Sequence, residues 1–149
     1  MHTADIIWTC AGDFAKGTYS RGHIWRFDGG VEVPGSASPS VVPTPYSVVE
    51  AVDPEEAYIA SLSSCHMLWF LDIAKRAGVL VASYHDHATG ALETEGGRVW
   101  IPRVDLNISV VFDGKAPDRV RHQELHDKAH HACFIANSVK TKIVINLKD

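Results

Sequence analysis

Apolar and polar residues alternate along several short stretches of the chain, and this period of two is typical of strands that bury one face. In the clearest stretch, 104–112, apolar residues at every second position alternate with Asp105, Asn107 and Ser109. Gly-rich turns follow the strand-like stretches, and Glu95-Gly96-Gly97 has the composition of a hairpin turn. The stretches in which we expect strands are 6–10, 16–27, 31–33, 79–93, 104–112 and 139–147.

Two segments carry the signals of a helix start. The motif Asp53-Pro54-Glu55-Glu56 places Asp at the N-cap, Pro at the first helical position and Glu at the third. We expect this helix to run from Pro54 to about Arg76, with Gly78 ending it. Because its middle is apolar nearly all round, it is expected to be central and buried. Pro117 and Asp118 open a second helix that is predicted to reach about Ala136.

The predicted order of elements is βββ-α-ββ-α-β. Hairpin-linked strands beside two segregated helices indicate the α+β class, with largely antiparallel sheets around a central buried helix. A length of 149 residues with 46% hydrophobic residues fits one domain spanning residues 1–149. The formal net charge of −4 argues against nonspecific binding to nucleic acid or to an anionic membrane. Without a signal-peptide pattern, and with three cysteines, the chain is expected in the reducing cytoplasm.

The cysteines are the first candidates for chemistry. Cys65 lies in the middle of the first predicted helix among serines and a histidine, and Cys133 lies near the end of the second. A free cysteine usually behaves as a small buried hydrophobe. Two thiols can instead form a redox pair when their Cα atoms approach within about 7 Å. Cys10 shares strand parity with Ile6 and Trp8 and is expected to serve packing.

Arginines and histidines supply further candidates. Arg21 and Arg26 fall on opposite faces of the predicted strand 16–27, so only one can point towards a packed helix. A guanidinium among aromatic rings could lower the pKa of a thiol, or it could simply cover a sheet edge. A stripe at i, i+4 and i+8 of the second helix could hold a metal ion, although a solvated polar face is the expected reading. The stripe consists of His122, His126 and His130.

These residues together resemble the OsmC/Ohr superfamily, which covers osmotically inducible protein C and the organic hydroperoxide resistance proteins. The resemblance rests on Pro54-Glu55 before a helical Cys65, on Cys133 a further 68 residues along, and on the order of the elements. It implies an OsmC-like fold in an intertwined homodimer whose sites form at the subunit interface.

The resemblance also implies an activity. The family member would be a peroxiredoxin-like oxidoreductase of the antioxidant stress response, reducing organic hydroperoxides to alcohols. Cys65 would be the peroxidatic thiol and Cys133 the resolving thiol, with Arg21 and Glu55 holding the thiolate. No bound cofactor is implied, because an external reductant, either a small dithiol or a lipoyl-type protein, regenerates the thiols. Glu55 and Cys65 lie about 15 Å apart along one helix, so Glu55 would act through Arg21 or from the partner subunit.

Some positions depart from the best-known branches of the family. His66 follows the first cysteine where those branches carry an apolar residue, and Phe134 follows the second where they carry Pro. No Arg or Lys occurs in 34–53. A divergent subfamily is therefore expected. The alternative is a non-catalytic module that binds a small molecule or metal through His122, His126 and His130, with inert thiols.

Overall fold

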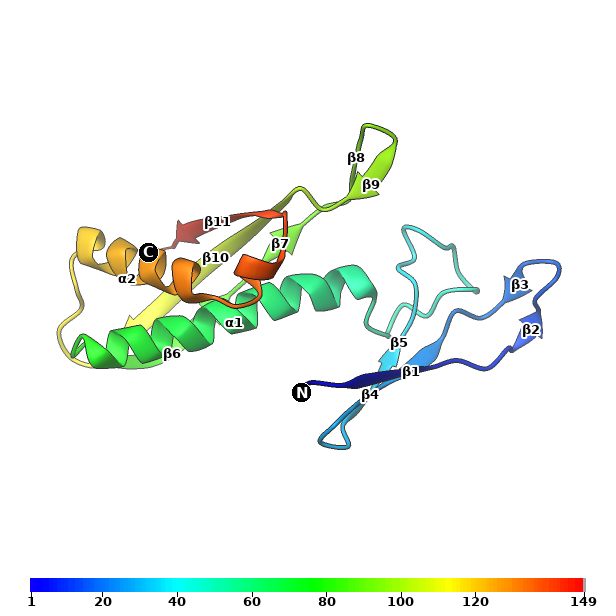
Figure 1. The fold of residues 1–149 in the computed structure, drawn as a ribbon, viewed down its shortest axis with the longest axis horizontal. Helices are drawn as coiled ribbons and strands as arrows, with labels where there is room; N and C mark the ends of the chain where they lie inside the picture. The colour runs from blue at the N-terminus through cyan, green and yellow to red at the C-terminus, as the bar shows by residue number, and fades with distance from the viewer. Residues whose placement is uncertain (149) are drawn as a thin grey trace. The chain divides into compact units, whose positions relative to one another are not determined.

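The computed structural model describes residues 1–148, which divide into two compact units, an N-terminal unit Met1–Tyr58 and a C-terminal unit that begins at Ile59. Each unit has strands of its own (Figure 1). That residues 1–149 form a single domain stays a prediction.

The N-terminal unit is built on an antiparallel three-stranded sheet. Its strand order is β1 (Ala4–Ile7), β4 (His23–Phe27) and β5 (Glu32–Gly35), and a separate short pair joins β2 (Gly12–Asp13) to β3 (Thr18–Tyr19). The predicted continuous strand over 16–27 is therefore wrong. The chain turns at Ser20, whose hydroxyl accepts the Gly22 amide at 3.1 Å, and Arg21 donates its amide to the Tyr46 carbonyl at 2.8 Å. These local bonds replace the strand ladder at residues 20–22.

Helix α1 (Pro54–Arg76) begins and ends where the sequence predicts. The Asp53 carboxylate accepts the Glu56 amide at 2.8 Å, and the Glu56 carboxylate accepts the Asp53 amide at 3.1 Å. This reciprocal pair is a capping box that satisfies two amides of the first turn. Beyond the C-terminus Gly78 adopts φ +74°, the left-handed conformation that commonly ends a helix.

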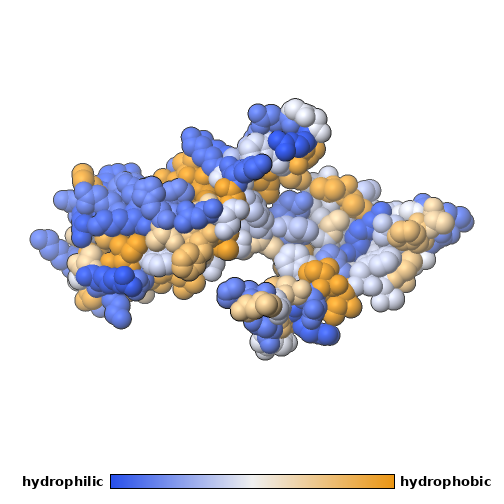
Figure 2. All heavy atoms as spheres, in the orientation of Figure 1, coloured by the Kyte–Doolittle hydropathy of each residue, from blue (hydrophilic) through white to orange (hydrophobic). Residues whose placement is uncertain are grey.

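One stripe of α1 is buried, not its whole circumference. Leu62, His66, Phe70 and Ala74 recur every four residues on the buried face, whereas Leu68 is 61% exposed. Figure 2 shows hydrophobic residues along α1 and mainly hydrophilic ones over the neighbouring helix α2 (Arg119–Ala132). The helix is thus buried along one face and exposed along another. By length and hydropathy α1 could also cross a membrane, a test that core helices of soluble proteins pass as well.

The C-terminal unit contains a four-stranded sheet centred on β10 (Arg103–Phe112). This strand pairs antiparallel with β6 (Val81–Asp86) and β7 (Thr89–Gly90), and parallel with β11 (Lys142–Leu147). The parallel pair is joined through α2 (Arg119–Ala132), as a crossover connection requires. The other pairings between the described strands are antiparallel, so the α+β class with largely antiparallel sheets is confirmed.

The segment predicted as one strand over 79–93 is divided between β6, β7 and β8 (Glu93–Glu95). β8 pairs with β9 (Arg98–Trp100) across Gly96 and Gly97, whose φ angles are +56° and +75°. Two consecutive positive φ angles are what a two-residue type I′ hairpin turn needs, and glycine adopts them without strain. The predicted hairpin turn is confirmed.

Both helices cover one face of this sheet (Figure 1). Phe70 and Ala74 of α1 pack with Leu125 and Ala129 of α2, and the surrounding partly buried side chains include Tyr84 on β6. Burying each large apolar side chain contributes roughly 1.5–3 kcal/mol. The second helix ends at Ala132 and not near 136 as predicted, because the next residue is extended, with φ −64° and ψ 114°. A short 3-10 helix, η1 (Ala136–Ser138), follows.

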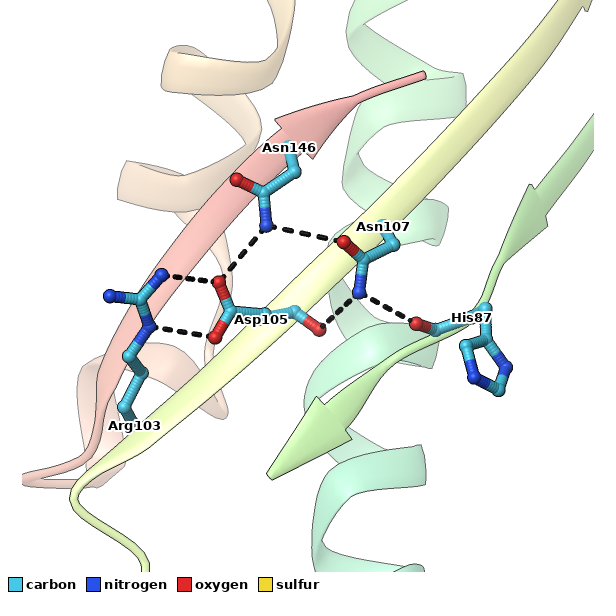
Figure 3. Close-up of polar contacts among 5 residues, drawn as sticks. All are labelled: His87, Arg103, Asp105, Asn107 and Asn146. Carbon is cyan, nitrogen blue, oxygen red and sulfur yellow. Dashed lines mark hydrogen bonds and ion pairs between the residues drawn. The ribbon is translucent and has the colours of Figure 1, made fainter. Parts of the chain in front are cut away.

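A polar network fixes the register of the parallel pair on the opposite face of the sheet (Figure 3). The Asn146 amide donates to Asp105 at 3.0 Å and to Asn107 at 3.3 Å, its partner directly across the ladder. Hydrogen bonds from Arg103 and Asn146 lower the pKa of Asp105 to about 2. Arg103 also pairs with Asp105 through its Nε atom at 2.7 Å. A one-residue slip of β11 would break these bonds.

Candidate functional site

Cys65 and Cys133 lie together in the C-terminal unit, although 68 residues separate them in the sequence. The Cys65 side chain acts on the pKa of the Cys133 thiol, so the two side chains are neighbours. The contact follows from the antiparallel course of the two helices. Phe70 of α1 stacks on His126 of α2. Because the helices run in opposite directions, Cys65, which precedes Phe70, comes to lie beside Cys133, which follows His126. The structure therefore brings together the two thiols that the sequence predicts as a pair.

The two thiols differ in their surroundings. Cys65 is half-buried on α1, whereas Cys133 is 1% exposed at the C-cap of α2. Burial, and after it the neighbouring Cys65 side chain, raises the pKa of Cys133 to about 11, against an opposing hydrogen bond from the Ala136 amide. That amide lies 3.4 Å from the Cys133 sulfur. At neutral pH Cys133 is therefore a protonated thiol held against a more accessible sulfur.

Aromatic and aliphatic side chains lie on the same part of the unit. Phe134, next to Cys133, is 68% exposed and meets Trp69 of α1 edge to face, with ring centroids 5.3 Å apart. Leu68 of α1 is exposed as well. The chain thus presents apolar surface close to the thiol pair.

Histidines from both helices form a buried chain beside the thiols. The His126 Nδ1 atom lies 2.9 Å from Nε2 of His66, and its Nε2 atom lies 3.1 Å from Nε2 of His122. Burial lowers the pKa of His66 to about 4, with a further effect of His130, and burial lowers that of His126 to about 3. His122 is half-buried, and its pKa is lowered by burial and by Arg119.

This arrangement corrects the reading of His122, His126 and His130 as a solvated polar face, because His126 is fully buried. The sequence did contain a signal for this burial. The histidine stripe continues into Cys133 and lies next to Leu125, on the apolar side of α2. Nor do the three side chains converge on a metal. Within residues 1–148 no three His, Cys, Asp or Glu side chains are grouped to hold an ion.

Arg21 lies in the N-terminal unit among aromatic rings. Its guanidinium carbon sits 3.7 Å from the centre of the Tyr19 ring, and it donates to the carbonyls of Gly17 at 3.1 Å and Tyr19 at 2.6 Å. The same guanidinium lines a pocket of about 390 Å³ shared with Trp8 and Phe14. Arg26, on the central strand β4, instead pairs with Glu32 directly across the ladder on β5, at 2.7 Å. The geometry favours Arg21 over Arg26 as the arginine free to meet an anion.

Glu55 occupies the second position of α1, directly after Pro54. Its Oε2 atom is buried and has no hydrogen-bond partner within the described residues. A buried carboxylate oxygen without a donor is costly, so it fits a cationic partner. Glu55 and Arg21 both belong to the N-terminal unit, and their action on Cys65 stays a prediction.

The remaining cysteine is not part of the core. Cys10 is exposed, and its thiol donates to the nearby carbonyl of Gly12 at 3.7 Å. The expectation that it packs with Ile6 and Trp8 is wrong, because β1 ends at Ile7 and residue 10 lies in a connection.

The fold and the site define a class: an α+β protein in which two antiparallel helices on one face of a sheet hold a pair of free thiols. A family model described as OsmC-like protein matches residues 48–148, and the chain belongs to this family. No curated protein matches the chain.

Solved structures agree with this assignment. An OsmC-like protein of unknown function from Vibrio cholerae is 45% identical, with a TM-score of 0.94 over 99% of both chains. An organic hydroperoxide resistance protein OsmC from Legionella pneumophila is 15% identical, with a TM-score of 0.71 over 99% of this chain and 94% of its own. The organic hydroperoxide resistance protein OhrB of Bacillus subtilis is 20% identical, with a TM-score of 0.67 over 98% of both. These last two show the fold alone, and the set fits a divergent member of the family.

Proposed function

We propose that the chain is a thiol-dependent peroxidase that reduces organic hydroperoxides to alcohols. The observation that carries the proposal is that Cys65 and Cys133 are neighbours in the C-terminal unit although they lie 68 residues apart in the sequence, the proximity that a disulfide needs. The names of the similar proteins from Legionella pneumophila and Bacillus subtilis, both organic hydroperoxide resistance proteins, support the same reaction class.

The reaction starts at Cys65, the more accessible sulfur of the pair. Its thiolate attacks one oxygen of the hydroperoxide, the O–O bond breaks, and the alkoxide leaves and takes up a proton to give the alcohol. Cys65 is thereby oxidised to the sulfenic acid. Because this step needs only the sulfur and the peroxide, no cofactor is proposed.

Cys133 then resolves the sulfenic acid. Its sulfur attacks the sulfur of Cys65, the S–S bond forms, and the hydroxide leaves with the proton of Cys133 as water. The raised pKa of Cys133 suits this second role, because a protonated thiol does not compete for the peroxide but carries the proton that the leaving hydroxide needs. An external dithiol, either small or on a lipoyl-type protein, returns two electrons and two protons.

Arg21 and Glu55 complete the proposed site. Arg21 would stabilise the thiolate and the developing alkoxide, as preorganised positive charge does in such displacements. Glu55, with its unpartnered buried oxygen, would hold that guanidinium in place. We place the enzyme in the cytoplasm as an intertwined homodimer whose sites form at the subunit interface.

The apolar surface near the thiols sets the proposed substrate preference. Leu68 and Phe134 are exposed there, and burying them against an alkyl or aryl group would favour an organic hydroperoxide over hydrogen peroxide. Each buried methylene of the substrate contributes about 0.8 kcal/mol.

The test is peroxide consumption with a dithiol donor. Wild type and the Cys10→Ser control should turn over cumene hydroperoxide faster than hydrogen peroxide, and Cys65→Ser should be inactive. Cys133→Ser should complete one oxidation and then stall at the sulfenic acid. Full activity in Cys65→Ser, or none in wild type, would overturn the proposal.

A further inference from the structure

His122, His126 and His66 form one continuous line of hydrogen bonds from the half-buried side of α2 into the interior. The two links measure 3.1 Å and 2.9 Å. Phe70 holds the middle ring, stacking on His126 with centroids 4.0 Å apart and planes 9° apart. Phe112 holds the outer ring edge to face, with its centroid 5.1 Å from that of His122. The three imidazoles are thus fixed in place by packing.

A neutral imidazole carries one N–H donor and one bare nitrogen acceptor. Each of the two links needs one donor and one acceptor, so the rings can be ordered in only two ways. Either every N–H points towards His122, or every N–H points towards His66. Passing one proton in at one end and another out at the other end converts the first order into the second.

The inner end of the line reaches the turns that carry the thiols. His66 directly follows Cys65, it is 1% exposed, and its Nδ1 atom has no hydrogen-bond partner among the described residues. His130, one turn before Cys133, acts electrostatically on His66, so it faces the same interior region. The line therefore ends on a buried nitrogen, without a hydrogen-bond partner among the described residues, in the residue that directly follows Cys65.

We propose that His66, His126 and His122 form a path that moves a proton between the Cys65 site and solvent. The inference rests on the proposed peroxidase function and assigns three positioning residues to it. None of them touches the substrate. They supply a route for the proton that Cys65 loses on becoming a thiolate and that the departing alkoxide later recovers.

The proton balance closes at each nitrogen. At the start Nε2 of His66 donates to His126, Nε2 of His126 donates to His122, and Nδ1 of His122 carries its own proton. A proton released at the Cys65 site enters the line at Nδ1 of His66, each Nε2 proton moves one ring outward, and His122 releases its Nδ1 proton to water. The return of a proton to the alkoxide runs the same sequence backwards and restores the starting order.

The surroundings keep the rings neutral, so they pass a proton and do not store one. Burial lowers the pKa of both inner rings, to about 4 for His66 and about 3 for His126. The titratable neighbours are Tyr84 and Asp86 on β6 and Arg119 and His130 on α2. The proximity of Asp86 adds to burial in raising the pKa of Tyr84, so Tyr84 stays a neutral phenol beside His126.

The test compares His126→Gln with His131→Gln. Glutamine can still donate and accept a hydrogen bond, but its amide cannot relay a proton. His131 is exposed on the same helix and has no place in the line. Oxidation of Cys65 by cumene hydroperoxide is followed through the fluorescence of Trp69 at pH 7, in weak and in concentrated imidazole buffer. In weak buffer His126→Gln should be slower by about 100-fold, the lower end of general acid–base effects.

Concentrated imidazole should restore most of that rate, whereas wild type and His131→Gln should not respond to the buffer. An equal loss in both buffers would mean a structural role and would overturn the path, as would a normal rate in weak buffer.

Nitrogen-15 NMR of the reduced protein tests the path without peroxide. Deprotonating Cys65 should move the proton of His66 and His126 from Nε2 to Nδ1 together. If the tautomers of His66 and His126 change independently of each other, the path is overturned. If they change together but the protein does not react with peroxide, only the proposed peroxidase function is overturned.

Discussion

The ring of His126 lies flat on the ring of Phe70, with the centroids 4.0 Å apart, and this contact sets the register between α1 and α2. Both residues are fully buried, and Leu125 and Ala129 flank them on α2. The same register carries Cys133 to Cys65. The packing of one aromatic pair is therefore linked to the geometry of the thiol site.

Phe70→Ala should destabilise the protein by about 3–5 kcal/mol, because it removes a fully buried ring and leaves a cavity between the helices. Urea unfolding followed by circular dichroism measures the change. Val120→Ala is the matched control, since Val120 is 70% exposed on α2 and should change the stability by no more than about 0.5 kcal/mol. Similar losses in the two variants would contradict the packing described here.

The buried histidines predict a dependence of stability on pH. Their pKa values, about 4 for His66 and about 3 for His126, lie below the 6.5 of an unfolded histidine, so the unfolded chain binds more protons at acidic pH. The contribution of the neutral rings to the free energy of unfolding is complete above pH 6.5 and is lost as the pH falls towards 4. Each histidine contributes a slope of up to about 1.4 kcal/mol per pH unit in that window.

Urea midpoints between pH 7 and 4.5 measure this slope, and His126→Phe should reduce it. A slope unchanged by that substitution would show that His126 titrates normally.

Gly35 should not accept a side chain. A Cβ atom there would lie within 3.0 Å of Nε1 of Trp25 and of Nε2 of His23, two atoms that are hydrogen-bonded to each other at 2.7 Å. Gly35→Ala should therefore cost about 1–3 kcal/mol, as overpacking does elsewhere. Gly29→Ala is the control, because within residues 1–148, its two chain neighbours aside, no atom lies within 4 Å of the added Cβ. Thermal unfolding of both variants, followed by tryptophan fluorescence, distinguishes them.

Cys133 should titrate far above neutral pH. Burial is the main cause of its pKa of about 11, and the neighbouring Cys65 side chain adds to it. In a Cys10→Ser background, the thiolate absorbance of Cys65→Ala should appear only in strongly alkaline solution. A Cys133 thiolate at neutral pH would remove the basis for its resolving role.

Local signals in the sequence predict local structure well. The capping box between Asp53 and Glu56 depends on four consecutive residues, and the Gly96-Gly97 turn on two, so both could be read directly. The predicted strand over 16–27 was wrong because bonds to Ser20 and Tyr46 override its alternation.

Burial of individual faces needs contacts between distant segments. The sequence shows that α1 is apolar, but only its packing partners decide that Leu62 is buried and Leu68 is exposed. In the same way, the polar composition of α2 hides the fact that His126 meets His66, which lies 60 residues away. The two cysteines could be named as candidates, while their contact required the register of the two helices.

The central claim is that peroxide joins two particular sulfurs, and one measurement tests it most directly. Reduced Cys10→Ser protein is treated with one equivalent of cumene hydroperoxide, digested without reductant, and examined by mass spectrometry. The account predicts a single peptide pair linked through Cys65 and Cys133 and one molecule of alcohol per disulfide. Two unmodified thiols, or Cys65 oxidised to the sulfinic acid with Cys133 still free, would contradict it.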